Sequence, residues 1–161
     1  MYKISYQKEN HNLTLEISEL KYVLESSSEP ELSPNKDYVA IITPFEWECQ
    51  GEIRLINLKT GSSKRTELNL NANLTPKHVI WKNANTLFVL IGSNWGTVDI
   101  GGHLYSYNID YNELTLLKKF DDTIQIQEIQ KENDNLLILR GIKYIDDNFN
   151  ESEPYSTHYT L

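Results

Sequence analysis

Cysteine is almost absent from this chain, and glycine-rich motifs and long apolar runs are missing. The single cysteine among 161 residues, Cys49, excludes an internal disulfide, so a reducing compartment is the simplest setting. No glycine-rich phosphate loop or dinucleotide fingerprint occurs. No apolar run approaches the roughly 18–20 residues that span a bilayer. We therefore expect one folded domain, residues 1–161, that does not enter a membrane and carries no cofactor.

Basic residues are the minority among the charged ones. The net charge is −8 and the pI is about 5.0, so the average field repels nucleic acid and anionic lipid headgroups. A basic protein would be attracted instead, and long-range attraction raises association rates. Residues 1–10 lack the apolar centre of a secretory signal. We expect a cytoplasmic protein with a basic protein partner.

Catalytic and metal-binding motifs are also missing. The sequence has no nucleophile elbow, and the carboxylates of Glu46 and Glu48 disfavour a reactive thiolate at Cys49. The four histidines are scattered singly, without the spacing of a zinc site. The acidic stretch 146–153 resembles a calcium loop but has Glu151 where that loop needs glycine. Glycoside hydrolysis needs two carboxylates at a set separation, and that separation depends on the fold and cannot be read from the sequence. No acid, base and electrophile can be named together. We therefore predict a non-enzymatic protein without a metal site.

Alternation of apolar and polar residues runs along the whole chain, as in Leu13–Ile17 and Ile53–Leu58. A period of two is the signature of a half-buried strand, and the frequent Tyr, Ile, Val and Thr residues suit a pleated surface. No long stretch keeps helical spacing. The pattern predicts an all-β, antiparallel fold.

An internal repeat organises these strands. Ser33–Ile42 aligns with Lys82–Ile91 as a polar turn before an apolar strand, and each is followed by a loop and a strand that begins with glycine. The spacing of about 50 residues is a propeller-blade length. A weaker third copy begins at Ile124. We predict N-terminal strands in residues 1–25 and three blade-like units of about four strands each, near residues 30–75, 76–122 and 123–161.

Two segments in this repeat carry a family resemblance. Leu32–Ala40 resembles the Ser-Pro-Asp-Gly-Lys turn and strand of TolB-like and WD40-like β-propeller blades. Gly101–Tyr105 is similar to the Gly-Gly-Asn-Leu-Tyr motif of a bacterial family of uncharacterised propeller-like domains, with His103 in place of Asn. A closed propeller typically has 4–8 blades. The resemblance therefore implies an open or incomplete propeller, a sandwich, or closure by a second copy, and it implies no chemistry.

The loops between the aligned strands are the candidate binding site, and we expect them over Thr43–Gln50, Gly92–Gly101 and Gly141–Pro154. Equivalent loops of stacked blades emerge at one end, and here each combines aromatic residues with carboxylates. This rim would anchor a partner through aromatic side chains and meet its basic patch with acidic ones. The predicted partner-binding residues are Glu46, Trp47, Glu48, Trp95, Asp99, Tyr144, Asp146, Asp147 and Phe149.

One interpretation of these loops is purely structural: Trp47 and Trp95 fold back and cap the core. If the loops instead form a binding rim, two functions follow. The preferred one is a protein-binding module, most concretely an immunity protein or inhibitor that neutralises a basic bacterial nuclease toxin. That choice rests on an analogy of properties with acidic proteins that occupy a basic cleft. The alternative is a small-ligand or carbohydrate-binding domain in which Trp47, Trp95 and Tyr107 stack on a sugar.

Overall fold

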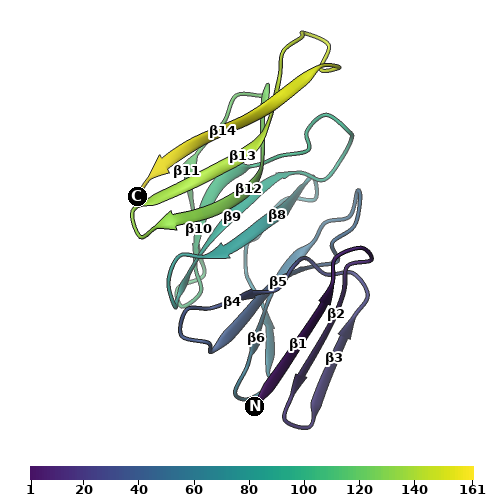
Figure 1. Ribbon diagram of the computed structural model, residues 1–161, viewed down its shortest axis with the longest axis vertical. Helices are drawn as coiled ribbons and strands as arrows, with labels where there is room; N and C mark the ends of the chain where they lie inside the picture. Colours follow the sequence, from purple (N-terminus) through teal and green to yellow (C-terminus); the bar gives the residue numbers. More distant parts are fainter.

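Fourteen β-strands and no helix make up the computed structural model, which describes residues 1–161. Consecutive strands pair antiparallel into four sheets of three, four, four and three strands. In chain order the strands are β1 (Tyr2–Gln7), β2 (Asn12–Ile17) and β3 (Leu20–Leu24); β4 (Glu31–Leu32), β5 (Tyr38–Thr43), β6 (Glu52–Asn57) and β7 (Ser63–Arg65); β8 (Leu74–Trp81), β9 (Thr86–Ser93), β10 (His103–Asn108) and β11 (Glu113–Lys118); and β12 (Ile124–Asn133), β13 (Leu136–Tyr144) and β14 (Ser152–Thr160). The sheets follow one another from the N-terminus to the C-terminus (Figure 1).

The antiparallel all-β prediction is confirmed, including its two specific pairings. β5 pairs with β6 from Tyr38 opposite Asn57 to Thr43 opposite Glu52. β9 pairs with β10 from Thr86 opposite Asn108 to Ile91 opposite His103. The sheets form an open row, which is one of the arrangements that the resemblance to propeller blades implied. No helix of the structure has the length and apolarity needed to cross a bilayer.

Three hydrophobic cores hold the row together, one between each pair of neighbouring sheets. β5 and β9 are buried on both faces because each lies in a middle sheet, so both read as continuous apolar runs. In β2, buried and less buried residues alternate strictly, because only the face that carries Leu13, Leu15 and Ile17 packs against the second sheet. A strand's pattern in the sequence therefore reports whether its sheet is central or terminal.

The two terminal sheets expose polar outer faces. In the first sheet, Lys3, Ser5 and Gln7 of β1 are exposed on the side away from the second sheet. In the fourth sheet, Arg140 and His158 are exposed on the side away from the third. Neither end of the row therefore offers a broad apolar face to a further sheet.

The structure differs from the expected units in two places. Residues 1–25 form a complete three-stranded sheet, and the fourth sheet has three strands instead of about four. β13 also continues to Tyr144 and β14 begins at Ser152, so the loop expected over Gly141–Pro154 is shorter. Gly141 looked like the start of a loop, but a Cβ there would lie 1.8 Å from the carbonyl oxygen of Gln125. This glycine serves close backbone packing within a strand.

Candidate functional site

Three hairpin loops turn at one end of the molecule, at the right of Figure 1. We call them the first loop (44–51, between β5 and β6), the second loop (94–102, between β9 and β10) and the third loop (145–151, between β13 and β14). The turn between β1 and β2, which contains His11, lies at the same end, here called the loop end. Equivalent positions in successive sheets bring these segments together.

The first loop is held against both neighbouring sheets. The Phe45 amide donates to Ser26 Oγ at 2.9 Å, and the Phe45 ring meets His11 edge-on at a centroid distance of 5.3 Å. On the other side, Gln50 Nε2 donates to the carbonyl oxygens of Asn71 and Leu74, both at 2.7 Å. These bonds fix the loop's two ends. Its middle residues project from a rigid base.

The second loop is fixed by its polar side chains and glycines. The Asn94 amide donates to Asn73 O at 3.0 Å and its Nδ2 donates to Ala72 O at 3.1 Å. Farther along, the Gly101 amide donates to Gln125 Oε1 at 2.8 Å. A Cβ on Gly101 would lie 2.5 Å from the Gln125 carbonyl carbon, so only glycine fits where this loop passes β12.

The third loop is closed by its own carboxylate. Asp146 Oδ1 accepts from the amides of Asn150 at 3.0 Å and Glu151 at 2.9 Å. Phe149 packs edge-on against Tyr144 at 5.2 Å, and the Tyr144 hydroxyl donates to Val98 O of the second loop at 2.9 Å. The second and third loops are therefore tied together. In the stretch that resembles a calcium loop, the Asp146 carboxylate therefore binds the loop's own backbone amides.

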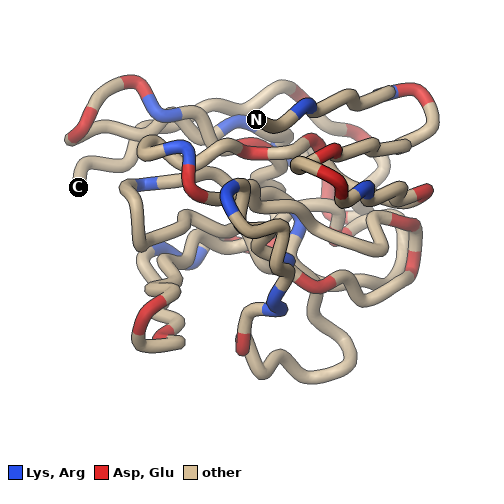
Figure 2. Tube along the Cα trace, turned by 90° about the horizontal axis from the view of Figure 1, so that it is seen from below, with Lys and Arg blue, Asp and Glu red and all other residues tan.

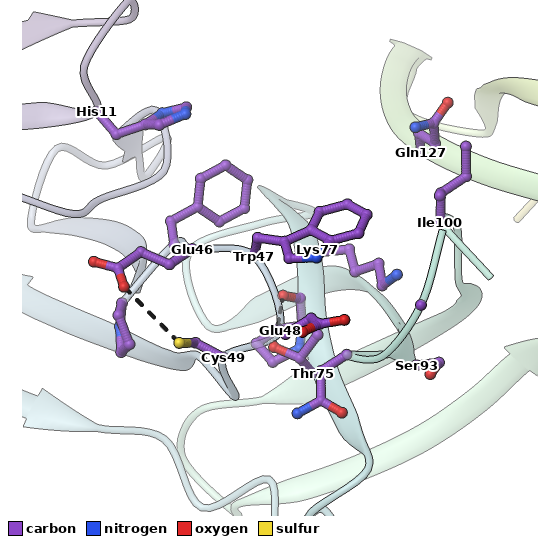
Figure 3. Close-up of a pocket in the computed structure, with 15 residues that line it drawn as sticks. His11, Glu46, Trp47, Glu48, Cys49, Thr75, Lys77, Ser93, Ile100 and Gln127 are labelled. Carbon is purple, nitrogen blue, oxygen red and sulfur yellow. Dashed lines mark hydrogen bonds between the residues drawn. The ribbon is translucent and has the colours of Figure 1, made fainter. Parts of the chain in front are cut away.

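A pocket of about 440 Å³ opens between the first and second loops. Its lining comes from all four sheets, and Figure 3 shows His11 and Gln127 on opposite sides with Trp47 and Lys77 between them. The lining residues are His11, Pro44, Phe45, Glu46, Trp47, Glu48, Cys49, Thr75, Pro76, Lys77, Ser93, Asn94, Gly96, Ile100 and Gln127. The third loop contributes none of them.

One cation lies among the acidic residues of this pocket. Lys77 Nζ donates to the carbonyl oxygen of Asp99 at 2.8 Å. Burial lowers the pKa of Lys77 to about 8, with the Asp99 carboxylate opposing the shift. Glu46 turns toward Cys49, with 3.8 Å between Oε2 and Sγ (Figure 3). A pocket lined by the exposed carboxylates of Glu46 and Glu48 and by the half-buried amine of Lys77 can contact a ligand that carries both charge signs.

The predicted aromatic anchors divide into exposed and buried ones. Trp47 and Trp95 are 63% and 52% exposed, so the reading in which they cap the core is wrong. Phe149 is half-buried against Tyr144. Tyr144 is only 8% exposed and belongs to β13, because its ring packs inward and its hydroxyl is bonded to the second loop. Tyr107 is fully buried, which removes it from any sugar-stacking surface.

The predicted carboxylates lie at the loop end. Glu46, Glu48, Asp99 and Asp147 are exposed, whereas Asp146 is partly buried in the turn that it stabilises. Figure 2 shows acidic positions in red along the loops at its right, and others in turns at the left. Negative charge is therefore not confined to the rim. The rim differs from the opposite end because exposed tryptophans lie beside its carboxylates.

Sequence reasoning did not identify Thr75, Lys77 and Gln127 as site residues. All three lie in strands β8 and β12, outside the loops that the repeat singled out. Only the packing of sheets three and four brings them to the pocket. The sequence carries no local signal for this, since each sits in an ordinary strand pattern.

Two of the four histidines, His78 and His103, serve the fold. Nδ1 of His78 accepts from the Ile129 amide and Nδ1 of His103 accepts from the Phe120 amide, both at 3.1 Å. Burial lowers the pKa of both imidazoles, which suits an accepting, neutral ring. No group of three or more His, Cys, Asp or Glu side chains is arranged to hold a metal ion.

Solved structures with the same architecture were found. The crystal structure of a candidate conserved lipoprotein from Clostridium novyi NT has a TM-score of 0.77 and 25% identity, and the match covers 100% of this chain and 95% of that one. TolB from Acinetobacter baumannii has a TM-score of 0.53 at 12% identity over 95% of this chain. An acylaminoacyl peptidase from Pyrococcus horikoshii has a TM-score of 0.53 at 15% identity over 98%. The resemblance to TolB-like propellers is thereby confirmed for the fold.

The chain spans only 36% of the TolB chain and 29% of the peptidase chain, so these two matches carry no activity across. No curated protein matches at a significant level. The model of one protein family does match, over residues 3–160. The chain therefore belongs to the family described as "Domain of unknown function (DUF4652)".

Proposed function

We propose that this protein is a non-enzymatic binding module whose loop end holds a basic protein partner. The observation that carries the proposal is the pair of exposed tryptophans, Trp47 and Trp95, on loops that are rigidly held at their bases. Tryptophan is the side chain most enriched among interface anchors, and exposing two without a partner costs solvation free energy. Glu46, Glu48 and Asp99 beside them supply the attraction for a basic surface.

The finer form of the proposal is an immunity protein or inhibitor of a basic bacterial nuclease toxin. Its support is the net charge of −8 together with a rim that presents carboxylates around aromatic anchors. Such a surface mimics the charge of a nucleic acid and would occupy a basic cleft. A toxin gene adjacent to the gene of this protein would supply the partner to be tested.

A second candidate function has its own observation in the pocket. Its volume of about 440 Å³ lies within the range of small-molecule sites, and Trp47 and Phe45 give it apolar walls. A sugar or another polar small ligand would then bind between the first and second loops. Tyr107 plays no part in this version, because it is fully buried.

Cellular location decides which partners are available, and we propose the cytoplasm because the chain has a single, unpaired cysteine. The Clostridium novyi protein is described as a candidate lipoprotein. Attachment to a membrane as a lipoprotein is therefore the alternative location that we consider for this chain. Fractionation of the source cells separates the two. Recovery with the membrane fraction would contradict the cytoplasmic proposal.

Association kinetics test the protein-binding function. With the captured and purified partner, the triple variant Glu46→Gln, Glu48→Gln, Asp99→Asn should associate several-fold more slowly at about 50 mM salt and almost normally at about 500 mM, because rim charges act on encounter. Trp47→Ala should instead speed dissociation by about 30-fold or more, the loss of a hot spot of about 2 kcal/mol.

The matched control removes three exposed carboxylates from the opposite end, Glu19→Gln with Glu113→Gln and Glu132→Gln. It should leave both rates nearly unchanged. Equal effects of the rim and control variants would refute the loop end as the interface. Unchanged partner kinetics in Trp47→Ala, with loss of binding of a small sugar, would favour the pocket function instead.

A further inference from the structure

The outer edge of β14 has no partner strand. In the second and third sheets a fourth strand occupies this position, β7 beside β6 and β11 beside β10. The fourth sheet ends at β14, whose nine residues all pair with β13 on the other side. Figure 1 shows β14 at the margin of the molecule. The edge therefore presents a row of unpaired backbone groups.

Two backbone bonds show which residues point to this edge. The Leu161 amide donates to Asn135 O at 2.8 Å, on the β13 side, whereas the Tyr144 amide donates to Thr123 O, toward β12. Bonding direction alternates along an antiparallel strand. The odd-numbered residues of β14 therefore bond to β13. The residues that direct backbone groups to the free edge are Pro154, Ser156, His158 and Thr160.

This edge lacks the charges that usually protect an unpaired strand. Residues 154–160 contain no Lys, Arg, Asp or Glu in a chain that is 24% charged. The edge strands β7 and β11 both contain basic residues. Pro154, with no amide hydrogen, protects only one end of β14. A second copy could therefore approach this strand without facing a like charge along it.

The strand is also complementary to itself. Around Thr157 the order Tyr155, Ser156, Thr157, His158, Tyr159 is almost palindromic. In an antiparallel pair with a two-fold axis at Thr157, Ser156 faces His158 of the second copy, and both direct backbone groups to the edge. Tyr155 then faces Tyr159 in the closer, non-hydrogen-bonded type of pair, where aromatic side chains interact well.

We propose that two copies of this chain pair through β14 in this register, so that their fourth sheets join into one continuous sheet. Each Ser156–His158 pair would exchange two backbone hydrogen bonds, and the Thr160 amide would donate to the Pro154 carbonyl of the other copy. The two Thr157 residues lie opposite each other on the axis. This isologous arrangement closes on itself and leaves the β14 edge of neither copy unpaired.

The free edge of β14 lies away from the strands that join the third and fourth sheets. The principal contacts between these sheets are made by β12, the first strand of the fourth sheet, with β8 and β9, the first two strands of the third. β14 and β11, farther out, make no comparable contact. The loop end is formed by the turns and not by this edge, so the dimer leaves the proposed partner site open.

Sedimentation and register-specific crosslinking test the dimer. The mass of the full chain should rise with concentration from 18.7 kDa toward twice that value. His158→Pro removes one edge-directed amide hydrogen and leaves the β13 pairing intact, so it should remain monomeric with an unchanged circular dichroism spectrum.

For crosslinking, Thr157→Cys and Ser156→Cys are each placed in a Cys49→Ser background. In the proposed register the two Thr157 Cα atoms lie about 4.5 Å apart, within disulfide range, whereas the Ser156 residues lie diagonally beyond it. Thr157→Cys should form a covalent dimer at least about tenfold faster than Ser156→Cys under mild oxidation. A monomer at all concentrations, a dimeric His158→Pro, or equal crosslinking of the two cysteine variants would overturn the proposal.

Discussion

Gly101→Ala is the substitution for which the structure predicts the clearest loss of stability. The added Cβ would lie 2.5 Å from both the carbonyl carbon of Gln125 and the amide nitrogen of Ile126. Relief requires the second loop to move from β12, which weakens the bonds from Gly101 N to Gln125 Oε1 and from Gly102 N to Ile126 O, at 2.8 and 2.9 Å. Two hydrogen bonds at about 1 kcal/mol each and an overpacking cost of about 1–3 kcal/mol give about 3–5 kcal/mol.

The matched control is Gly96→Ala in the same loop. Gly96 has a φ of +80° and no atom within 4 Å of an added Cβ, so its cost is conformational and amounts to about 1 kcal/mol. Urea unfolding of both variants, followed by tryptophan fluorescence, measures the two free energies of unfolding. A Gly101→Ala variant no less stable than Gly96→Ala would refute the steric account of this junction.

Two further predictions concern buried polar groups. Tyr107→Phe should lower the free energy of unfolding by about 1–3 kcal/mol, because the Glu67 amide that donates to the Tyr107 hydroxyl at 3.0 Å loses its acceptor; a loss below about 0.3 kcal/mol in urea unfolding would contradict this. Burial and then Glu29 raise the pKa of Glu31 from 4.5 to about 7, so the folded protein binds more protons than the unfolded chain between these values and stability falls as pH rises through that window. Glu31→Gln should remove about 1–2 kcal/mol of this fall after allowance for solvent screening, and unfolding curves at pH 5 and pH 8 that differ as much as in the native protein would contradict it.

The strand pairings could be predicted because they are local. Tyr38–Thr43 and Thr86–Ser93 are continuous apolar runs, each followed by a loop and a partner strand, so the next strand in the chain was the natural neighbour. The first sheet was not recognised as an equal unit, since it lacks the polar Ser33-Pro34-Asn35 type of turn that marks the repeat. Its alternating pattern was nevertheless visible, and it reports a terminal position.

The common end of the loops could also be predicted, but the pocket could not. The equivalent positions of the loops in the repeat predict that Trp47 and Trp95 lie at one end. Their exposure depends on hydrogen bonds that hold the loops, such as that of Asn94, and no sequence pattern predicts these bonds. Lys77 and Gln127 reach the site through packing between sheets that are far apart in the sequence. Tyr144 was misplaced because Gly141 resembles a loop residue when its neighbour Gln125 is unknown.

The pocket touches every sheet of a row in which each hydrophobic core joins only two neighbours. Such a row behaves as a one-dimensional chain of units, in which a terminal unit can open at the expense of a single interface. A molecule bound between His11 and Gln127 would couple the first sheet to the fourth, a link that the polypeptide itself lacks. Binding would then make unfolding more cooperative. Without the bound molecule a terminal sheet can open alone, whereas with it the four sheets would open together.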